Sequence, residues 1–250
     1  MKKWIAYLLL FVLLASCDKE EEKEVLHVLA AASLKEPLME LKARFEQAYD
    51  VDVQFQFGGS GKLAQQIKQG APADVYIAAD EKWLTDLKEK NLIQSDSSQT
   101  VAKNKLVLIG KEGSKAIEDL SDLAVEIQGG IAIGHPDTVP AGNYAKQTLQ
   151  ALGKWEVLKE NMIYTSDVRQ ALTYVETGNV TYGFVYETDA RLSEDVAILL
   201  EVPNHLHAPI RYPATIVADT NQEEMAKAWL EFLRSEQAKK IMESYHFSMN

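Results

Sequence analysis

From residue 25 onward, short apolar runs of the sequence alternate with longer segments in which apolar side chains recur at helical spacing. The runs at 25–30 and 51–57 are typical of strands. Between them, apolar residues three or four positions apart predict a helix: Leu34, Leu38, Leu41, Phe45 and Ala48. Strands that alternate with helices favour an α/β fold, in which helices cover a largely parallel sheet.

A second set of such elements follows a change of pattern near residue 105. The apolar run at 105–109 is followed by Gly110 and a polar stretch, as expected where a chain leaves one sheet for another. The later predicted strands lie at 130–134, 182–186 and 212–218, and the predicted helical segments at about 142–152, 168–176 and 223–245. A chain of 250 residues permits one large domain or two small ones. We therefore expect two α/β lobes joined by more than one crossing: residues 25–104 with 212–250, and residues 105–211.

The amino-terminal segment has the pattern of an export signal. Two lysines precede a run of twelve apolar residues at 4–15, which is too short to span about 30 Å of hydrocarbon at 1.5 Å per residue. The segment 14–17 ends in the only cysteine, Cys17, and resembles the bacterial lipobox, in which the cysteine is acylated and the chain is cut just before it. We expect residues 1–16 to be a signal peptide, Cys17 to carry a lipid anchor, and residues 17–24 to be a charged tether on the extracytoplasmic side of a membrane.

The charge balance argues against a nucleic-acid partner. The chain has 26 Lys plus Arg against 37 Asp plus Glu, a formal net charge of −11, which becomes −13 when residues 1–16 are removed with their two lysines. Nucleic-acid-binding proteins usually carry a basic patch. A small anion is not excluded, because helix N-termini hold anions through unpaired N–H groups without Lys or Arg. The 46% hydrophobic and 25% charged content excludes a disordered chain.

The loop at 58–62, Gly-Gly-Ser-Gly-Lys, precedes a helix expected at 62–69 and invites two enzymatic interpretations. A phosphate-binding P-loop fails on spacing, because Gln56 and Leu63 occupy positions that require Gly and Ser or Thr. A nucleophile elbow fails because Lys62 stands where its last glycine belongs. These motifs therefore support neither nucleotide hydrolysis nor esterase chemistry.

Other candidate sites in the sequence are weaker. His205 and His207 have the spacing of one strand face, but no neighbouring cysteine or acidic pair completes a set of metal ligands, so no metal site is expected. Ser33 is followed by Glu36 at the spacing of a capping box. One interpretation of Ser33 is therefore that it only caps its helix.

Five junctions between strands and helices nevertheless carry groups that donate hydrogen bonds. They are Ser33, Ser60, the segment 134–142, the segment 165–169, and Tyr186 at the end of a strand. In α/β folds, ligands bind in the crevice beyond the carboxyl ends of strands. Helix N-termini add unpaired N–H groups and a partial positive charge. The sequence thus indicates a crevice that offers hydrogen-bond donors to a small dianion.

Five blocks of the sequence carry a family resemblance. They are 30–34 (Ala-Ala-Ala-Ser-Leu), 70–80 (Gly-Ala-Pro-Ala-Asp-Val-Tyr-Ile-Ala-Ala-Asp), 139–146 (Val-Pro-Ala-Gly-Asn-Tyr-Ala-Lys), 167–172 (Asp-Val-Arg-Gln-Ala-Leu) and 183–190 (Gly-Phe-Val-Tyr-Glu-Thr-Asp-Ala). In this order they resemble the periplasmic molybdate-binding proteins of ABC transporters. The similarity runs from about residue 25 to residue 247.

The resemblance implies a two-lobed class II periplasmic-binding-protein fold, each lobe a mixed, mostly parallel sheet flanked by helices, with the ligand in the cleft between the lobes. It implies that hydroxyl and backbone amide groups of five residues hold molybdate or tungstate: Ser33, Ser60, Ala141, Val168 and Tyr186. It also implies a binding protein without turnover or cofactor, which delivers the oxyanion to an ABC permease. We expect a monomer. Lys62 and His135 depart from the usual family pattern and leave the five donors in place.

A site that offers only donors selects among oxyanions. Phosphate keeps a proton at neutral pH, which such a site leaves without an acceptor at a cost of about 1–3 kcal/mol, whereas molybdate, tungstate and sulfate are fully deprotonated. Sulfate is smaller than molybdate and loses contact with some donors. The sequence leaves open a receptor for sulfate or another tetrahedral oxyanion. It also leaves open an exported serine hydrolase that uses Ser33 or Ser60, although no histidine follows either serine at a motif spacing.

Overall fold

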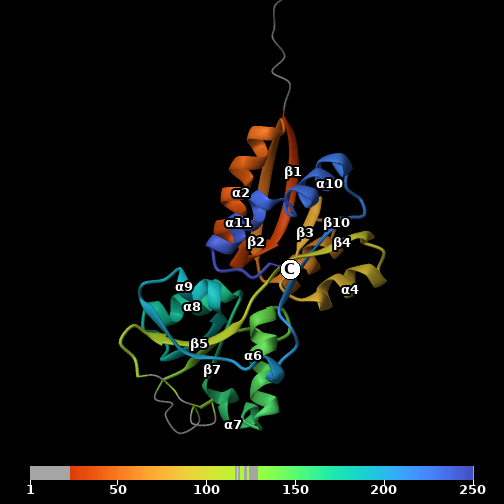
Figure 1. Ribbon diagram of the computed structural model, residues 1–250. Coiled ribbons are helices and arrows are strands. Elements are labelled where there is room, and N and C mark those ends of the chain that lie inside the picture. Colours follow the sequence, from red (N-terminus) through yellow and green to blue (C-terminus); the bar gives the residue numbers. More distant parts are fainter. Residues whose placement is uncertain (1–22, 116, 118, 121–122, 124–128, 250) are drawn as a thin grey trace, which may run out of the picture.

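The computed structural model describes residues 23–249 except 116, 118, 121–122 and 124–128. The strands of these residues form two five-stranded sheets, and helices flank each sheet. Figure 1 shows the two sheets as two lobes that meet where the chain crosses from one to the other. The two-lobed α/β fold expected from the sequence is confirmed.

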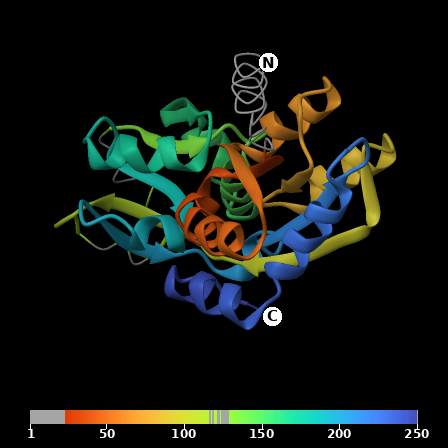
Figure 2. The same cartoon turned by 90° about the horizontal axis from the view of Figure 1, so that it is seen from above.

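Lobe 1 contains the sheet with strand order β2-β1-β3-β10-β4. Its strands are β1 (Glu24–Ala31), β2 (Val51–Gly58), β3 (Val75–Ile77), β4 (Ile93–Lys103) and β10 (Arg211–Val217). Its helices are the short η1 (Ala32–Leu34), α2 (Lys35–Ala48), α3 (Ser60–Lys68), α4 (Glu81–Glu89), α10 (Glu223–Phe232) and α11 (Glu236–Ser244). Seen from above in Figure 2, α2 and α11 lie side by side.

Lobe 2 contains the sheet with strand order β7-β6-β8-β5-β9. Its strands are β5 (Leu106–Lys111), β6 (Ile131–Gly134), β7 (Met162–Thr165), β8 (Tyr182–Tyr186) and β9 (Val196–Glu201). Its helices are α6 (Pro140–Ala151), α7 (Trp155–Leu158), η2 (Lys159–Asn161), α8 (Val168–Glu176), α9 (Glu187–Arg191) and η3 (Asn204–Leu206).

Both sheets are mixed. In lobe 1, β1 runs parallel to β2 and β3, whereas β10 runs antiparallel to β3 and β4. In lobe 2, β6 runs parallel to β7 and β8, whereas β5 runs antiparallel to β8 and β9. Parallel pairs are therefore half of the strand pairs rather than most of them. The antiparallel pairs arise because β5 and β10, the strands that follow the two crossings, run back along their neighbours.

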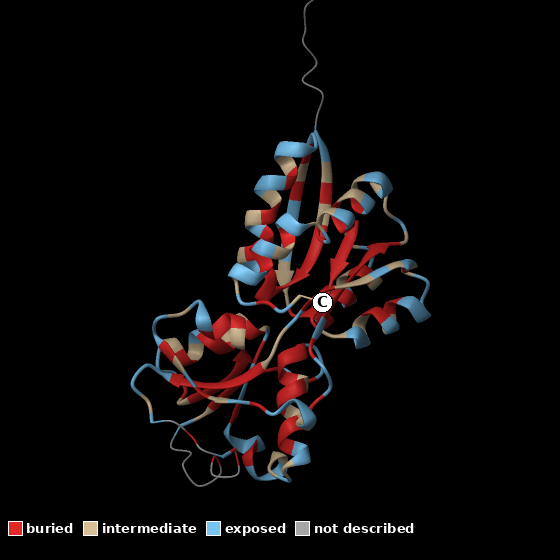
Figure 3. Cartoon of the chain, in the orientation of Figure 1, coloured by how far each residue is buried: buried red, intermediate tan, exposed pale blue. Residues whose placement is uncertain are grey.

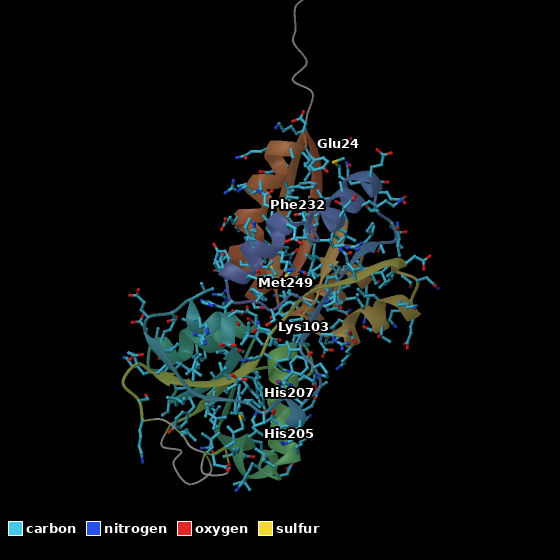
Figure 4. The ribbon with its side chains drawn as sticks, viewed as in Figure 1. Glu24, Lys103, His205, His207, Phe232 and Met249 are labelled. Atoms are coloured by element: carbon cyan, nitrogen blue, oxygen red, sulfur yellow. The ribbon has the colours of Figure 1, made fainter. Side chains whose placement is uncertain are left out.

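The two lobes are connected by the chain between β4 and β5 and by the chain between β9 and β10. Lys103, the last residue of β4, lies at the level where the lobes meet in Figure 4. Figure 3 shows that buried residues follow the strands of both lobes, while exposed residues lie on the outer sides of the helices. In lobe 1, the buried rings of Phe45 and Trp229 pack edge to face with centroids 5.0 Å apart.

The sequence-based expectation lacks the strands β4, β7 and β9 and the helices α4, α7 and α9, as well as the three short 3₁₀ turns. β4 is the clearest case, because residues 94–100 are all polar and the strand lies at the edge of its sheet. A strand at the edge of a sheet has a neighbouring strand on one side only and is exposed to solvent on the other. Its side chains therefore need not alternate between apolar and polar. Helix α6 begins at Pro140, two residues before its expected start, because the fixed φ angle of proline suits the first helical position.

The predicted signal peptide at 1–16 and the predicted lipid anchor at Cys17 lie outside the described residues. Of the predicted tether, the structure describes only Lys23 and Glu24, and Glu24 already begins β1. Among the helices found between residues 23 and 249, none in the described segments is both long and apolar enough to span a membrane.

Candidate functional site

Two cavities define the candidate sites. The larger is a groove of about 1050 Å³ on lobe 1, between β4 and the helices α10 and α11, and its walls carry side chains of both charges. The smaller is a pocket of about 10 Å³ between the lobes, lined by residues 31–33, 58–60, 79, 139–141, 167–168 and 186. Pockets for drug-sized ligands measure about 300–1,000 Å³, so the smaller pocket accepts only an ion or a molecule of a few atoms.

The pocket lies beyond the carboxyl ends of parallel strands in both lobes. On the lobe 1 side it is lined by residues at the ends of β1 and β2 and by Ala79 just after β3. On the lobe 2 side it is lined by the first residues of α6 and α8 and by the last residue of β8. Carboxyl ends of parallel strands are the usual ligand position in α/β sheets. The topology therefore brings together segments that are far apart in the sequence.

Three helices begin at the pocket. They are α3, α6 and α8, whose first turns contain Ser60, Ala141 and Val168 respectively. The N–H groups of a first helical turn have no partner within the helix, and the helix dipole places a partial positive charge there. Because Pro140 has no N–H group, Ala141 is the first residue of α6 that offers one. The pocket thus receives the positive ends of three helices.

All five residues predicted to hold the oxyanion line this one pocket. Each has a side chain that is at least nine-tenths buried: Ser33 (1% exposed), Ser60 (0%), Ala141 (0%), Val168 (4%) and Tyr186 (1%). Ser33 and Ser60 come from lobe 1 and the other three from lobe 2. The structure therefore brings the five residues together, and their role as ligands remains a prediction.

Ser33 does not cap a helix. It lies in η1, and the residue at the N-cap position of α2 is Leu34, which makes no side-chain cap. The Ser33 Oγ atom instead lies 2.9 Å from the Tyr212 hydroxyl oxygen. The capping-box interpretation is wrong because a 3₁₀ turn separates the strand from the helix and directs the serine toward β10.

Ser60 is the first residue of α3, and its hydroxyl and its carbonyl oxygen are both engaged within lobe 1. Its Oγ accepts a hydrogen bond from the backbone N–H of Ala79 at 3.1 Å. Its carbonyl oxygen accepts one from the Tyr76 hydroxyl at 2.7 Å. The bond from Ala79 positions the Ser60 side chain at the pocket wall.

The Tyr186 hydroxyl is buried at the pocket and has no hydrogen-bond partner among the described residues. Burial raises the pKa of this hydroxyl well above its usual value of 10.0, and nearby tyrosines and carboxylates raise it further. The side chain therefore stays protonated and retains a hydrogen to donate. A buried polar group without a partner is costly, and a bound ion or water is one way to satisfy it.

Several contacts join the two lobes around the pocket. The Gly61 N–H donates to the Thr138 carbonyl oxygen at 2.8 Å, and the Tyr144 hydroxyl donates to the Ala79 carbonyl oxygen at 3.2 Å. Gly59 approaches lobe 2 so closely that an added Cβ atom would lie 2.7 Å from the Ser166 carbonyl oxygen. The lobes are thus closed on each other at the pocket.

A family model for bacterial extracellular solute-binding proteins matches residues 26–248. The chain belongs to this family.

Curated relatives agree with this assignment. A Bacillus subtilis protein named "Putative ABC transporter substrate-binding lipoprotein YvgL" is 38% identical over 98% of this chain and 96% of its own length. The molybdate-binding protein ModA of Escherichia coli is 36% identical over 89% of this chain and 88% of its own length. The periplasmic molybdate-binding protein of Azotobacter vinelandii has a similar solved structure, with a TM-score of 0.80, 25% identity and coverage of 90% of this chain and 99% of that one. The resemblance found in the sequence is confirmed, and the chain is a solute-binding protein rather than an enzyme.

An ion pair also connects the lobes of this solute-binding protein. Arg169, the second residue of α8, forms ion pairs with Glu36 of α2 and with Asp189 of α9, the latter at 2.7 Å. Asp189 is fully buried, and burial raises its pKa from 3.8 to about 6, against the opposing effect of Arg169. Because Arg169 follows Val168 directly, the ion pair between Arg169 and Glu36 helps to hold the start of α8 against lobe 1.

The raised pKa of Asp189 predicts a pH dependence of stability. Between about pH 4 and pH 6 the folded chain holds a proton on Asp189 that the unfolded chain has lost, so this group's contribution to the free energy of unfolding falls as pH rises. Asp189→Asn removes the titration. We expect the difference in unfolding free energy between wild type and Asp189→Asn to fall by about 1–3 kcal/mol over this range and then level off. Urea titrations of both proteins from pH 4 to pH 8 measure this, and a constant difference would contradict the prediction.

Among the described residues, no lysine, arginine or histidine lines the pocket of this solute-binding protein. Its one carboxylate, Asp167, caps α8 by accepting a hydrogen bond from the Gln170 N–H at 3.0 Å. Lys62 and His135, the two departures from the family pattern, are exposed and lie outside the pocket lining. The donors available at the pocket are therefore hydroxyl and backbone N–H groups rather than charged side chains.

The remaining histidines support no metal site. Figure 4 shows His205 and His207 in lobe 2, away from the junction of the lobes. His207 contacts the Ala208 carbonyl oxygen through Nδ1 and packs against the Tyr144 ring. Within the described segments, no group of three or more His, Cys, Asp or Glu residues has the arrangement of a metal site.

Proposed function

We propose that this solute-binding protein captures molybdate, and also tungstate, in the pocket between its lobes. The hydroxyls of Ser33, Ser60 and Tyr186 and the backbone N–H groups of Ala141 and Val168 donate hydrogen bonds to the oxygens of the anion. No cofactor takes part, and no bond of the oxyanion is broken.

The unpartnered Tyr186 hydroxyl carries this proposal. It is the one pocket hydroxyl with no partner in the described part of the chain, it is buried, and three helix N-termini share its pocket. A small anion gives that hydroxyl an acceptor and meets the positive ends of the helices. The names of the Escherichia coli and Azotobacter relatives support molybdate as the anion.

The chemistry of the lining supports selection of a fully deprotonated oxyanion. Among the described residues of the lining, the only carboxylate is that of Asp167, and both of its oxygens have donors from the protein: Oδ1 accepts the Gln170 N–H at 3.0 Å, and Oδ2 lies 3.4 Å from the Ser166 hydroxyl oxygen. Phosphate at neutral pH is a ligand that must itself donate a hydrogen bond. A receptor for sulfate or another tetrahedral oxyanion is the closest alternative, because sulfate is also fully deprotonated.

A serine hydrolase is less well supported. The Ser33 and Ser60 hydroxyls contact a tyrosine hydroxyl and a backbone N–H, and no histidine in the described part of the chain lines the pocket to act as their base. Turnover of an ester that disappears in Ser60→Ala would favour this alternative.

Calorimetric titration of residues 23–250 with molybdate, tungstate, sulfate and phosphate at pH 7 tests the function. We expect tight binding of one molybdate or tungstate per chain, weak binding of sulfate, and no heat with phosphate. Absence of heat with both molybdate and tungstate, using folded and ligand-free protein, would overturn the proposal. Preferred binding of sulfate would favour the alternative receptor.

The protein delivers its anion to an ABC permease in the cytoplasmic membrane and is held at the membrane by lipid on Cys17. The lipobox-like segment at 14–17 supports the anchor, as does the lipoprotein in the name of the Bacillus subtilis relative. In this proposal, wild-type protein from cells grown with a labelled fatty acid carries the label, and Cys17→Ser carries none. Absence of the label from the wild-type protein would contradict the anchor.

Closure of two lobes over the anion is the signal for the permease. The lobes are residues 25–104 with 212–250, and residues 105–211, so the hinge contains Asn104 and the chain just before residue 212. The arrangement of the sheets supports these boundaries, because β4 and β10 are neighbours in one sheet and β5 and β9 in the other. Small-angle scattering with and without molybdate measures the closure, and an unchanged radius of gyration would contradict it.

A further inference from the structure

The direction of the hydrogen bond between Ser33 and Tyr212 decides what Ser33 offers to the pocket. Their hydroxyl oxygens are 2.9 Å apart, and either hydroxyl is able to donate. If Ser33 donates to Tyr212, its oxygen faces the pocket as an acceptor. If Tyr212 donates to Ser33, the Ser33 hydrogen is free to point at the bound anion.

Asn104, in the crossing between the lobes, determines this direction. Its Oδ1 atom accepts the backbone N–H of Lys105 at 2.9 Å, which identifies the oxygen of the amide because an N–H group only donates. Its Nδ2 atom then donates to the Tyr212 hydroxyl oxygen at 3.1 Å and to the Thr188 hydroxyl oxygen at 2.8 Å. The orientation of the amide is therefore set by a backbone group.

The bond from Asn104 determines that the Tyr212 hydroxyl donates to Ser33. The Tyr212 side chain is fully buried, and its hydroxyl contacts only Asn104 and Ser33 among the described residues. Because the Asn104 Nδ2 group cannot accept, the Tyr212 hydrogen has Ser33 Oγ as its acceptor. Burial also raises the pKa of the Tyr212 hydroxyl, so that this hydrogen is retained. The Ser33 oxygen is then engaged and its own hydrogen is left for the pocket.

The Ser60 hydroxyl is also held as a hydrogen-bond donor, by a different group. Its Oγ accepts the Ala79 N–H, so its hydroxyl hydrogen is also left to donate. Both serines of lobe 1 thus have an acceptor position occupied by a donor of the protein. Tyr186 alone among the pocket hydroxyls has no such partner in the described residues, and a phenol oxygen is a poorer acceptor than a serine oxygen.

We propose that Asn104 and Tyr212 are positioning residues that hold Ser33 as a hydrogen-bond donor and thereby make the pocket discriminate against oxyanions that carry a proton. The inference rests on the proposed function, since it concerns the specificity of the same pocket. It assigns specificity to two residues that do not line the pocket. One of them lies in the crossing on which the lobes move.

The test compares the affinities for molybdate and for phosphate at pH 7 in wild type, Tyr212→Phe and Asn104→Asp, with the weak affinity for phosphate measured by its competition with molybdate. Tyr212→Phe removes the donor that orients the Ser33 hydroxyl, so the serine is able to turn its oxygen toward the proton of phosphate. We expect the ratio of phosphate affinity to molybdate affinity to rise at least about tenfold, the factor that corresponds to 1.4 kcal/mol.

Asn104→Asp reverses the direction of the two hydrogen bonds that link residue 104, Tyr212 and Ser33. An ionised carboxylate only accepts, so Tyr212 donates to residue 104 and Ser33 donates to Tyr212, which turns the serine oxygen toward the pocket as an acceptor. The added negative charge weakens the binding of every oxyanion. The ratio of the two affinities corrects for this effect to first order. We expect the ratio to rise at least as far as in Tyr212→Phe. Asn104 is only half-buried, so this variant keeps the test usable if Tyr212→Phe does not fold.

Tyr76→Phe is the matched control. Tyr76 is as buried as Tyr212 and its hydroxyl also contacts a pocket serine, but it donates to the carbonyl oxygen of Ser60 rather than to the side chain. We expect this variant to keep the wild-type ratio. An unchanged ratio in both Tyr212→Phe and Asn104→Asp, with molybdate still bound, would overturn the inference and leave the proposed function intact. An equal rise in Tyr76→Phe would also overturn it, whereas wild type that binds no molybdate would overturn the function itself.

Discussion

Tyr186→Phe is expected to weaken molybdate binding by about 10–100-fold without lowering the stability of the ligand-free protein. A hydrogen bond to a charged group contributes about 1.5–3 kcal/mol, and the variant loses one such bond to the anion. The ligand-free protein loses no bond, because the Tyr186 hydroxyl has no partner among the described residues. Removal of a buried hydroxyl that lacks a partner costs nothing in the folded state. Affinity and stability are thus expected to respond differently to one oxygen atom.

Calorimetry with molybdate and thermal unfolding without it measure the two responses. Tyr76→Phe serves as the control, since the Tyr76 hydroxyl makes a 2.7 Å bond to the Ser60 carbonyl oxygen and its removal should lower the melting temperature. A Tyr186→Phe protein that unfolds at a lower temperature than wild type would show that the hydroxyl has a structural partner. Unchanged molybdate affinity would remove Tyr186 from the proposed ligands.

The fold follows from sequence patterns where apolar spacing is strong. The expected strands at 51–57 and 182–186 and the expected helix at 168–176 agree with β2, β8 and α8 to within one residue. β4 shows the limit of such patterns. Its polar residues pair with β10, and that pairing is decided by a neighbour more than 100 positions away in the sequence. Hydrophobic periodicity contains no information about such a partner.

The pocket was partly predictable for a related reason. Ser60 and Val168 lie at strand-to-helix junctions, where the local sequence marks a helix start, and family resemblance added Ala141 and Val168 as amide donors. The environment of Ser33 was not predictable in this way. Its spacing to Glu36 indicates a capping box, whereas its actual partner is Tyr212, 179 positions away. Glu36 instead pairs with Arg169 of the other lobe. Local spacing indicates which hydrogen bonds a side chain is able to form. The tertiary fold decides which of these bonds is formed.

The largest loss of binding is expected from a single methyl group at Gly59. The backbone angles of Gly59, φ −64° and ψ 131°, suit any residue, so Gly59→Ala should not disturb lobe 1 by itself. Its Cβ atom, however, would lie 2.7 Å from the Ser166 carbonyl oxygen and 3.1 Å from the Val139 side chain, both in lobe 2. The Ser166 atom belongs to the backbone just before α8, so it cannot turn aside as the end of a side chain would. The lobes must then stay apart, and Val168 cannot reach the anion together with Ser60.

We expect Gly59→Ala to weaken molybdate binding by more than about 100-fold, because separated lobes leave the anion with the donors of one lobe only, a loss above 2.7 kcal/mol. Gly58→Ala is the matched control, since an added Cβ there meets only the Leu63 side chain at 3.6 Å, an ordinary contact within lobe 1. Calorimetry gives the affinities, and small-angle scattering shows whether molybdate still compacts each variant. The ligand-free melting temperature should be the same in both variants, because the open form relieves the clash. A Gly59→Ala protein that binds molybdate as tightly as Gly58→Ala would contradict closure of the lobes over the anion as the source of affinity.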